Sequence, residues 1–346
     1  MKERLSNFEL LRGILMFMII CVHLTGHGIL DPNSHVPLSA NNWLYANIID
    51  SFFYCCVNAF VLISGYWGLR PTLKKYLLLD IPVIIYCLIA SVIIDGFQNF
   101  HFTYFIPTIT NKYWFLTQYF LLYITSPILN KYIENTNQKT LLTTILMGGA
   151  VFVVVPSILH ITYIGERGMD FINFSLIYLM GRYIKIYDIN ISLKKGFSLY
   201  LITSLIILFL VLWAGYKNGV NKGWRINYYA YNTILVYLQT LGFFFIFKNL
   251  NFKSKIINYL SPSFFYIYII HSNPSVREHL YTDWLKCPDY YYSEYFLLHL
   301  FSCAIFIFVS CLLIDIIIRR LTLNKVIVEM SNNIESMSQN FSKFFK

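Results

Sequence analysis

Stretches of about 20 mostly apolar residues recur along the whole chain, and short polar segments separate them. A helix needs roughly 20 apolar residues to cross the hydrocarbon core of a bilayer. The pattern therefore predicts an all-α, polytopic membrane protein with about ten transmembrane helices. The predicted spans lie near residues 8–28, 44–67, 77–95, 113–131, 141–160, 171–187, 197–214, 228–247, 260–275 and 294–318.

We treat residues 1–320 as one transmembrane domain. The tail 321–346 is polar with scattered apolar positions, which predicts a cytoplasmic segment that either forms a short amphipathic interfacial helix or stays disordered. No internal repeat is evident, so the inverted-repeat architecture of many transporters is not supported.

The basic residues orient the predicted helices. With a cytoplasmic amino terminus, 20 of the 27 Lys and Arg residues fall in cytoplasmic segments, so the positive-inside rule predicts that both termini are cytoplasmic. Three outer basic residues share the loop GYKNGVNKGWR, which is either a binding loop for an anionic polymer or headgroup, or a loop with unselected charge. The seven outer basic residues are Lys112, Arg167, Lys217, Lys222, Arg225, Arg277 and Lys286.

Composition excludes an ordinary soluble domain, because 57% of the residues are apolar and only 13% are charged. The net charge of +10 comes from short basic clusters between apolar stretches, so we predict a lipid bilayer as the surroundings and no nucleic-acid partner. The seven cysteines form no CxxC pattern; six are predicted to be small core residues, and Cys287 lies in a loop.

The first predicted helix carries Arg12 and His23 inside an otherwise apolar stretch. At about 100° per residue, the interval between them spans three turns plus about 20°, so both side chains lie on one helix face. They are about 16 Å apart along the axis, near half the thickness of the hydrocarbon core. The helix is thus predicted to hold a cation near one membrane surface and a titratable base deeper in the membrane.

Three histidines are candidates for chemistry. His23 can accept a proton from an attacking hydroxyl or amine, and the alternative is a structural histidine that bonds a neighbouring helix. His271 ends the apolar stretch FFYIYII between Pro262 and Pro274, and we expect it at the depth of His23, lining the same cavity. His27 is predicted at the outer mouth. An HxxxH pair alone is weak evidence for a metal, so no metal is predicted.

Several other polar residues lie within predicted spans. Arg12 can bind a phosphate or carboxylate through its planar fork of donors, or it can be neutralised by Glu9 three residues earlier; we weight these equally. Trp114 fits an aromatic belt at the outer interface and is also a candidate substrate contact. Asp50 and Asn58 need buried partners that the sequence does not identify.

The second predicted span ends with NAFVLISGYWGLRPTLKK, where Ser64, Gly65 and Gly68 interrupt an apolar helix. Small residues allow a backbone or a ligand to approach closely, and Arg70 follows at once, so this corner suits a phosphate-bearing cofactor. A helix-ending turn with ordinary topology residues is the simpler explanation. Arg182, in GRYIK, is likewise either a phosphate contact or a topology residue.

These stretches also occur in a characteristic order: ELLRG and VH with ten residues between Arg12 and His23, then FVLISGY, YWFLTQYFLLYITSPILN, GRYIK and FYIYIIHS. In this order the chain resembles acyltransferase family 3, a family of integral membrane acyltransferases, over residues 1 to about 320. The resemblance implies about ten spans and the transfer of acetyl, sometimes succinyl, groups from cytoplasmic acyl-CoA to extracytoplasmic carbohydrates.

The resemblance also implies roles for particular residues. Arg12 and His23 correspond to the arginine and histidine of the family's first helix, which are associated with activity. The tripeptide from Ser64 to Tyr66 matches the family's Ser-Gly-Tyr/Phe element. Arg70 stands where a basic cytoplasmic loop approaches the CoA, although RPTLKK departs from the paired-arginine versions of that loop.

We therefore expect acetyl-CoA to dock from the cytoplasm with its phosphates near Arg12, Arg70 and Arg182, and its thioester near His23. His23 then either deprotonates the acceptor hydroxyl or briefly carries the acyl group. The expected acceptor is a cell-surface glycan, such as an exopolysaccharide, or a lipid-linked sugar at the bacterial cytoplasmic membrane, with polysaccharide-assembly proteins as partners. The alternatives are a transporter or flippase for a lipid-linked sugar, and a glycan polymerase.

Overall fold

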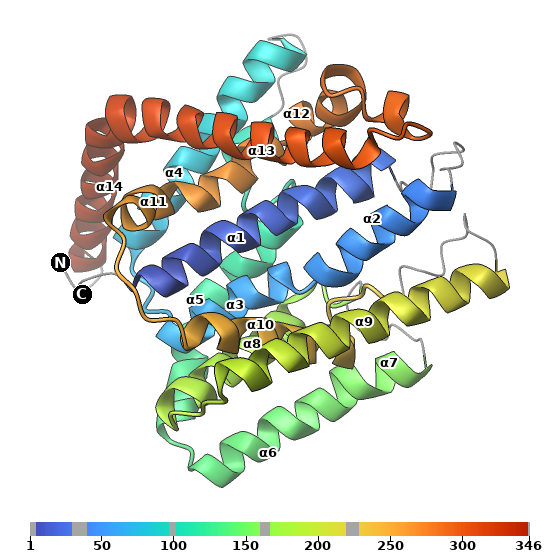
Figure 1. Cartoon of the computed structure of the whole chain (residues 1–346). Coiled ribbons are helices and arrows are strands. Elements are labelled where there is room, and N and C mark those ends of the chain that lie inside the picture. Colours follow the sequence, from blue (N-terminus) through green and yellow to red (C-terminus); the bar gives the residue numbers. More distant parts are fainter. Residues whose placement is uncertain (1–4, 30–39, 97–101, 160–166, 219–227, 345–346) are drawn as a thin grey trace.

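A computed structural model of the chain describes residues 5–29, 40–96, 102–159, 167–218 and 228–344. Every regular element in these ranges is helical, and the long helices run side by side in roughly one direction (Figure 1). The predicted all-α membrane protein is confirmed, since six helical segments are long and apolar enough to cross a membrane. These six are Ser6–His27, Asn41–Trp67, Leu73–Asp95, Gln138–Leu159, Leu193–Lys217 and Phe296–Ser338.

Each of the ten predicted spans overlaps one helix or one run of consecutive helices, although ten membrane crossings and two cytoplasmic termini stay predictions. These helices are α1 (Ser6–His23) with η1 (Leu24–Ile29), α2 (Ala40–Phe53) with α3 (Cys56–Trp67), α4 (Leu73–Ala90) with η2 (Ser91–Asp95), α5 (Trp114–Glu134), α6 (Gln138–Gly149) with η5 (Ala150–Val154) and α7 (Val155–Leu159), α8 (Phe171–Ile186), α9 (Leu193–Asn218), α10 (Ile234–Lys248), α11 (Lys255–His271), and α13 (Phe296–Asp315) with η9 (Ile316–Leu323). The other described helices are η4 (Phe102–Phe105), α12 (Pro274–His279), η7 (Leu280–Trp284), η8 (Cys287–Tyr290) and α14 (Asn324–Phe344).

Several helices begin at a polar side chain that caps the first turn. The side chains of Thr72, Asp170, Thr233 and Ser254 each accept a hydrogen bond from the backbone N–H three residues later. Such a cap satisfies a donor that the helix itself leaves free. The cap at Thr233 explains why α10 begins at Ile234, six residues after the start of the predicted span at 228.

Helix α1 lies at the centre of the bundle. It contacts α2, α3, α10, α11 and α13, and the side chains of Leu11, Leu15 and Ile20 are fully buried. Because neighbours surround most of this helix, most of its side chains contact other protein groups.

Helices α3 and α8 approach each other closely at two glycines. A Cβ atom on Gly65 would lie 2.5 Å from the carbonyl oxygen of Tyr178, and one on Gly181 would lie 2.6 Å from that of Leu62. Neither helix accepts a side chain at this crossing, so the small residues set the distance between the two helices. This contact fixes Arg182, one residue after Gly181, against the end of α3.

The bundle has two distinct ends. One end holds Ser6, Trp67 and Lys255, and the described part of the chain begins and ends on that side in Figure 1. We call it the terminal end. The opposite end is formed by η1, η2 and α12, and we call it the far end. Helix α1 runs from the terminal end to the far end, so Arg12 lies nearer the terminal end and His23 nearer the far end.

Two local predictions change in the structure. Pro262 lies inside α11 and does not precede it, because Ser254 caps a helix that begins at Lys255. The described part of the tail forms α14, which turns away from the bundle axis in Figure 1 and packs on α4, with Ile327 and Ser331 buried. This is the helical alternative for the tail. Most of the basic loop GYKNGVNKGWR, residues 219–225, lies outside the described residues.

The buried polar residues of the second predicted span have partners. Asp50 accepts a hydrogen bond of 2.5 Å from the hydroxyl of Thr25, and the Asn58 amide donates to the carbonyl of Tyr231 at 2.7 Å. All seven cysteines are buried and free. For six of them this position was predicted. Cys287, predicted to lie in a loop, instead begins η8 and is buried like the others.

Candidate active site

Helices α1 and α11 bring two imidazoles into contact. Nδ1 of His23 lies 3.1 Å from Nε2 of His271, which is buried at the last residue of α11. The hydroxyl of Ser272 lies 3.2 Å from the same Nδ1 atom. The two histidines that the sequence analysis selected, 248 residues apart in the chain, are therefore direct neighbours.

The hydrogen bonds determine which nitrogen of each neutral ring carries the proton. Nδ1 of His271 lies 2.7 Å from the carbonyl oxygen of Ile267, which can only accept, so this nitrogen is the donor. Nε2 of neutral His271 then has a free electron pair, and it accepts a hydrogen bond from Nδ1 of His23. Nε2 of His23 is left unprotonated. The arrangement thus orients a base, in the way that a third group orients the histidine of a catalytic triad.

His27 extends the pair toward the far end. Its ring centroid lies 5.3 Å from that of His23 and 6.0 Å from that of Tyr281, with the His27 and Tyr281 rings stacked. His27 is exposed, whereas Tyr281 is buried. His27 therefore lies between the histidine pair and the solvent at the far end, consistent with the position expected for it.

A narrow cavity follows one face of α1 toward His23. Met16, Ile19 and His23 lie at successive helix turns on the face that also carries Arg12. The cavity has a volume of about 30 Å³, close to the space of a single water molecule, and its other walls are apolar and aromatic. They are Val57, Phe60, Trp114, Phe115, Phe265 and Tyr268.

Trp114 packs against other aromatic side chains of the bundle. Its ring stacks on that of Tyr231 with centroids 5.7 Å apart, and it lines the cavity that contains His23. It also contacts the ring of Phe174 on α8. A place in an aromatic belt and a contact with substrate both stay predictions for Trp114.

Arg12 forms an ion pair with Glu9, the residue that the sequence analysis weighed against an anionic ligand as its partner. Its Nη1 atom lies 2.8 Å from Oε1 of Glu9, and the side chains are 32% and 9% exposed. The guanidinium is therefore neutralised on one side and still accessible on the other. Arg12 also lies within electrostatic range of Tyr119, whose hydroxyl is 3.1 Å from that of Ser64.

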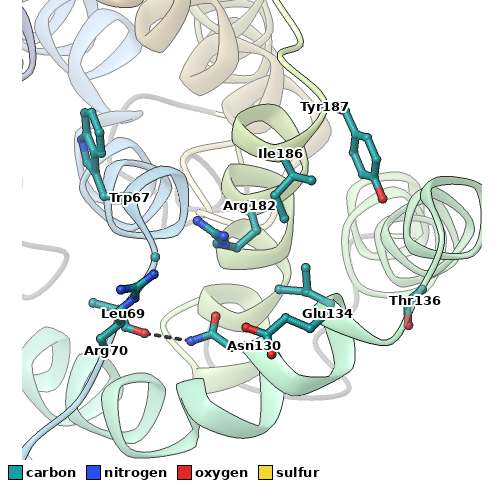
Figure 2. Close-up of a pocket in the computed structure, with 11 residues that line it drawn as sticks. Trp67, Leu69, Arg70, Asn130, Glu134, Thr136, Arg182, Ile186 and Tyr187 are labelled. Carbon is teal, nitrogen blue, oxygen red and sulfur yellow. Dashed lines mark hydrogen bonds between the residues drawn. The ribbon is translucent and has the colours of Figure 1, made fainter.

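A larger pocket opens at the terminal end, and Figure 2 shows its lining residues. Its volume is about 340 Å³, within the range of small-molecule sites. Arg70 lies in the loop between α3 and α4 and Arg182 lies on α8, and both line the same pocket, as Figure 2 shows. The full lining is Trp67, Gly68, Leu69, Arg70, Asn130, Ile133, Glu134, Thr136, Arg182, Ile186 and Tyr187.

Gly68 and Arg182 are fitted to each other. Gly68 has a φ of 76°, which side-chain-bearing residues rarely adopt, and a Cβ atom there would lie 2.8 Å from Nη1 of Arg182. Nη1 of Arg182 donates to the carbonyl of Tyr66 at 3.4 Å, whereas its Nε is buried without a partner among the described residues. A half-buried guanidinium with an unused buried donor is suited to an anionic ligand.

The pocket wall also contains neutral and acidic groups. The amide of Asn130 donates to the carbonyl of Leu69 at 2.8 Å, drawn in Figure 2, and its oxygen accepts from the hydroxyl of Tyr178 at 2.6 Å. Glu134 places a carboxylate on the same wall. The pocket thus offers two cations and one anion, a pattern suited to a ligand with phosphates and an amino group.

The three residues of the Ser64–Tyr66 tripeptide make different contacts. Ser64 bonds the carbonyl of Phe60 and meets Tyr119 near Arg12. Gly65 makes the close contact with α8, and Tyr66 is buried with its ring stacked on Phe8 at 5.2 Å. None of the three lines the large pocket, so their part there is to hold the end of α3, and with it Gly68, in place.

Several site residues were missed by the sequence analysis. Tyr268 lies one turn before His271 in the stretch FYIYIIHS, and that spacing is a local signal for a shared face. Tyr119 lies one turn after Phe115, with the two rings stacked at 5.8 Å. Glu134 and Asn130 carry no local signal, because α5 reaches the large pocket only after the helices have packed.

Comparisons with known proteins agree with this architecture. Residues 5–320, nearly the whole chain, match the family described as Acyltransferase domain. A search of curated proteins found no match. A search of solved structures likewise found none. Across the described residues no group of three or more His, Cys, Asp or Glu side chains is arranged to hold a metal ion. With its helical membrane architecture, this chain belongs to acyltransferase family 3 and is a membrane acyltransferase.

Proposed function

We propose that the protein transfers an acetyl group, or alternatively a succinyl group, from cytoplasmic acyl-CoA to a hydroxyl of a polysaccharide or lipid-linked sugar on the outer side of the bacterial cytoplasmic membrane. The observation that carries the proposal is the alignment along α1. A large pocket with two arginines lies at the terminal end, and a narrow cavity on the Arg12 face of α1 is lined by His23, whose Nε2 is left unprotonated by the hydrogen bonds of the histidine pair.

The large pocket is suited to the nucleotide part of acyl-CoA. Arg70 and Arg182 supply guanidinium groups for its phosphates, and the unpartnered Nε of Arg182 has a donor to offer. Glu134 can accept a hydrogen bond from the adenine amino group, which gives the carboxylate a role beside phosphates. Arg12 already forms an ion pair with Glu9, so in this proposal it contributes less to the binding of acyl-CoA than Arg182 does.

The narrow cavity is suited to the pantetheine arm and the thioester. Its apolar walls exclude bulk water, and this protects the thioester from hydrolysis. The cavity must widen by side-chain movement to admit the arm, because its volume of about 30 Å³ is that of one water molecule. The distance of about 16 Å between Arg12 and His23 is then covered by the arm.

His23 acts as the general base in this proposal. Its Nε2 takes the proton of the acceptor hydroxyl, while the hydroxyl oxygen forms a bond to the thioester carbonyl carbon. When the tetrahedral intermediate collapses, the carbon–sulfur bond breaks and the proton passes from His23 to the departing thiolate. His271 holds His23 in the required tautomer through the hydrogen bond between their rings.

The acceptor side is the far end, where His27 is exposed and Trp114 and Tyr268 line the cavity near His23. Aromatic rings pack well against sugar faces, which suits a glycan or a lipid-linked sugar. Polysaccharide-assembly proteins that deliver the acceptor are the expected partners.

Inside-out membrane vesicles test the proposal, because they expose the donor side to the medium. Labelled acetyl-CoA added outside should transfer its label to glycan inside the vesicles, and His23→Ala vesicles should not do so. A vesicle that moves sugar across the membrane but leaves the label on CoA would favour the transporter or flippase instead.

A further inference from the structure

A second cation lies close to the histidine pair, and the mechanism above does not use it. Arg277 is on α12, which begins three residues after His271, and Figure 1 shows this orange segment at the far end of the bundle. Arg277 and Tyr281 are four residues apart, so they share a face of the continuous α12 and η7 segment. Tyr281 stacks on His27, which directs this face toward the histidines.

The segment that carries Arg277 is firmly anchored. The side chain of Asn273 accepts from the backbone N–H of Ser275 at 3.0 Å and donates to the hydroxyl of Tyr113 at 3.0 Å. The hydroxyl of Ser275 donates to Asp95 on η2 at 2.6 Å. The backbone N–H of Arg277 donates to the carbonyl of Asn273 at 2.7 Å. Contacts within the protein thus fix the position of the segment that carries Arg277.

The charge of Arg277 is directed at the candidate active site. Its guanidinium lies within electrostatic range of His23, Tyr268 and Tyr281. Tyr268 lines the cavity with His23, and Tyr281 stacks on His27. Arg277 therefore lies at the rim of the acceptor side, whereas the two arginines of the large pocket lie at the opposite end of the bundle.

Among the described residues, Arg277 has no counter-ion. Its half-buried side chain forms no hydrogen bond or ion pair with any residue that the structure describes. Two acidic groups close to this segment have other partners: Asp283 pairs with His279 at 2.6 Å, and Asp95 accepts from Ser275 and Tyr104. A half-buried cation is normally paired. Because Arg277 is not paired with a described residue, its guanidinium can donate hydrogen bonds to an anionic ligand.

We infer that Arg277 binds an anionic group of the acceptor, so that the acceptor is an acidic sugar that presents a carboxylate or a phosphate beside the reacting hydroxyl. The inference rests on the proposed function and deepens it by naming the substrate class. The phosphates of acyl-CoA are a poorer fit for Arg277, because the donor's nucleotide is assigned to the large pocket at the terminal end. Bidentate binding by Arg277 orients the sugar so that one hydroxyl faces His23.

Binding of simple sugars tests the inference without acyl transfer. The purified full chain in detergent is titrated with glucuronate, glucose 1-phosphate and glucose, and dissociation constants are taken from the shift of the unfolding midpoint. We expect at least one anionic sugar to bind more tightly than glucose, and Arg277→Gln to weaken that binding about tenfold or more, leaving the glucose value unchanged. The better of the two anions identifies a carboxylate or a phosphate acceptor.

Two further variants locate the effect. Arg277→Lys keeps the charge without the fork, so anion binding should fall less than in Arg277→Gln; this readout also holds if Arg277→Gln fails to fold. Arg70→Gln is the matched control, because it removes an arginine at the terminal end and should leave glucuronate binding unchanged. Glucuronate and glucose 1-phosphate that bind no better than glucose would overturn the inference. So would anion binding that is lost in Arg70→Gln but kept in Arg277→Gln.

The outcomes also separate the inference from the proposed function. A protein that binds an anionic sugar through Arg277 but transfers no acetyl label in vesicles keeps the inferred anion site and loses the proposed reaction. A protein that acetylates glycan equally well with Arg277 and with Gln at this position keeps the reaction and loses the inference.

Discussion

The pocket at the terminal end and the cavity nearer the far end differ in volume and in the polarity of their walls. At the terminal end the pocket is about 340 Å³ and contains Arg70, Arg182 and Glu134. Nearer the far end the cavity is about 30 Å³, mostly apolar, and lined by His23, which is hydrogen-bonded to His271. The wide polar pocket is suited to holding a large charged molecule, and the narrow apolar cavity to orienting a few reacting atoms.

This difference suggests that donor binding and chemistry are separated along one helix. Arg12 and His23 are about 16 Å apart along the helix axis. Five neighbouring helices pack against α1 and hold it in place. Changes at the terminal end should then alter the affinity for acyl-CoA, whereas changes near the far end should alter the rate of transfer. The predictions below test this separation, beginning with the largest expected effect.

Replacing His23 should have the largest effect. We expect His23→Ala to lower label transfer from acetyl-CoA to glycan in vesicles by about 10²–10⁴-fold, because the general base is lost. Binding of acyl-CoA, measured by equilibrium binding to the same variant, should stay unchanged. Transfer at the wild-type rate would remove His23 from the reaction.

Replacing His271 should lower the rate without weakening donor binding. His271→Ala removes the acceptor for the Nδ1 proton of His23, so we expect kcat to fall by roughly tenfold to a hundredfold, as for other groups that orient a reactive histidine. KM for acyl-CoA should not change. His271→Gln is the matched control, since its amide oxygen can accept the same proton and should restore part of the rate. A loss confined to KM would contradict the orienting role.

Replacing the arginines of the large pocket should weaken donor binding and leave the rate of transfer nearly unchanged. We expect Arg70→Gln and Arg182→Gln each to raise KM for acetyl-CoA about tenfold with little change in kcat, because each loses a charge-assisted hydrogen bond to a phosphate. Acetyl-pantetheine, which lacks the nucleotide, should be used equally well by both variants and by the wild type. A similar loss with both donors would show that the arginines do not bind the nucleotide.

Replacing Glu9 should have the smallest effect. Glu9→Gln releases Arg12 from a partly exposed ion pair, so the free energy of unfolding should change by no more than about 1 kcal/mol. If Arg12 contributes to donor binding, the affinity for acyl-CoA should rise by a small factor. Weaker donor binding in this variant would mean that the pair positions Arg12 and does not compete with the donor.

The sequence by itself determined the helical architecture and the face that Arg12 and His23 share. Apolar stretches in lipid must become helices, because only there does each backbone group find a partner within its own segment. The helical repeat then places residues eleven apart on one face, and capping residues such as Thr233 and Ser254 begin helices by local contacts. All of these features depend on residues close together in the chain.

Tertiary structure alone decided the contacts between distant segments. The proton position on His23 depends on a ring 248 residues away, and the Arg182 guanidinium meets Tyr66 and Gly68 only because α3 and α8 cross at two glycines. The aromatic contacts of Trp114, and the unpaired state of Arg277 among the described residues, have the same origin. Hydropathy records how well a residue suits lipid, whereas the partner that it meets is set by the packing of several helices together, and no local pattern encodes that packing.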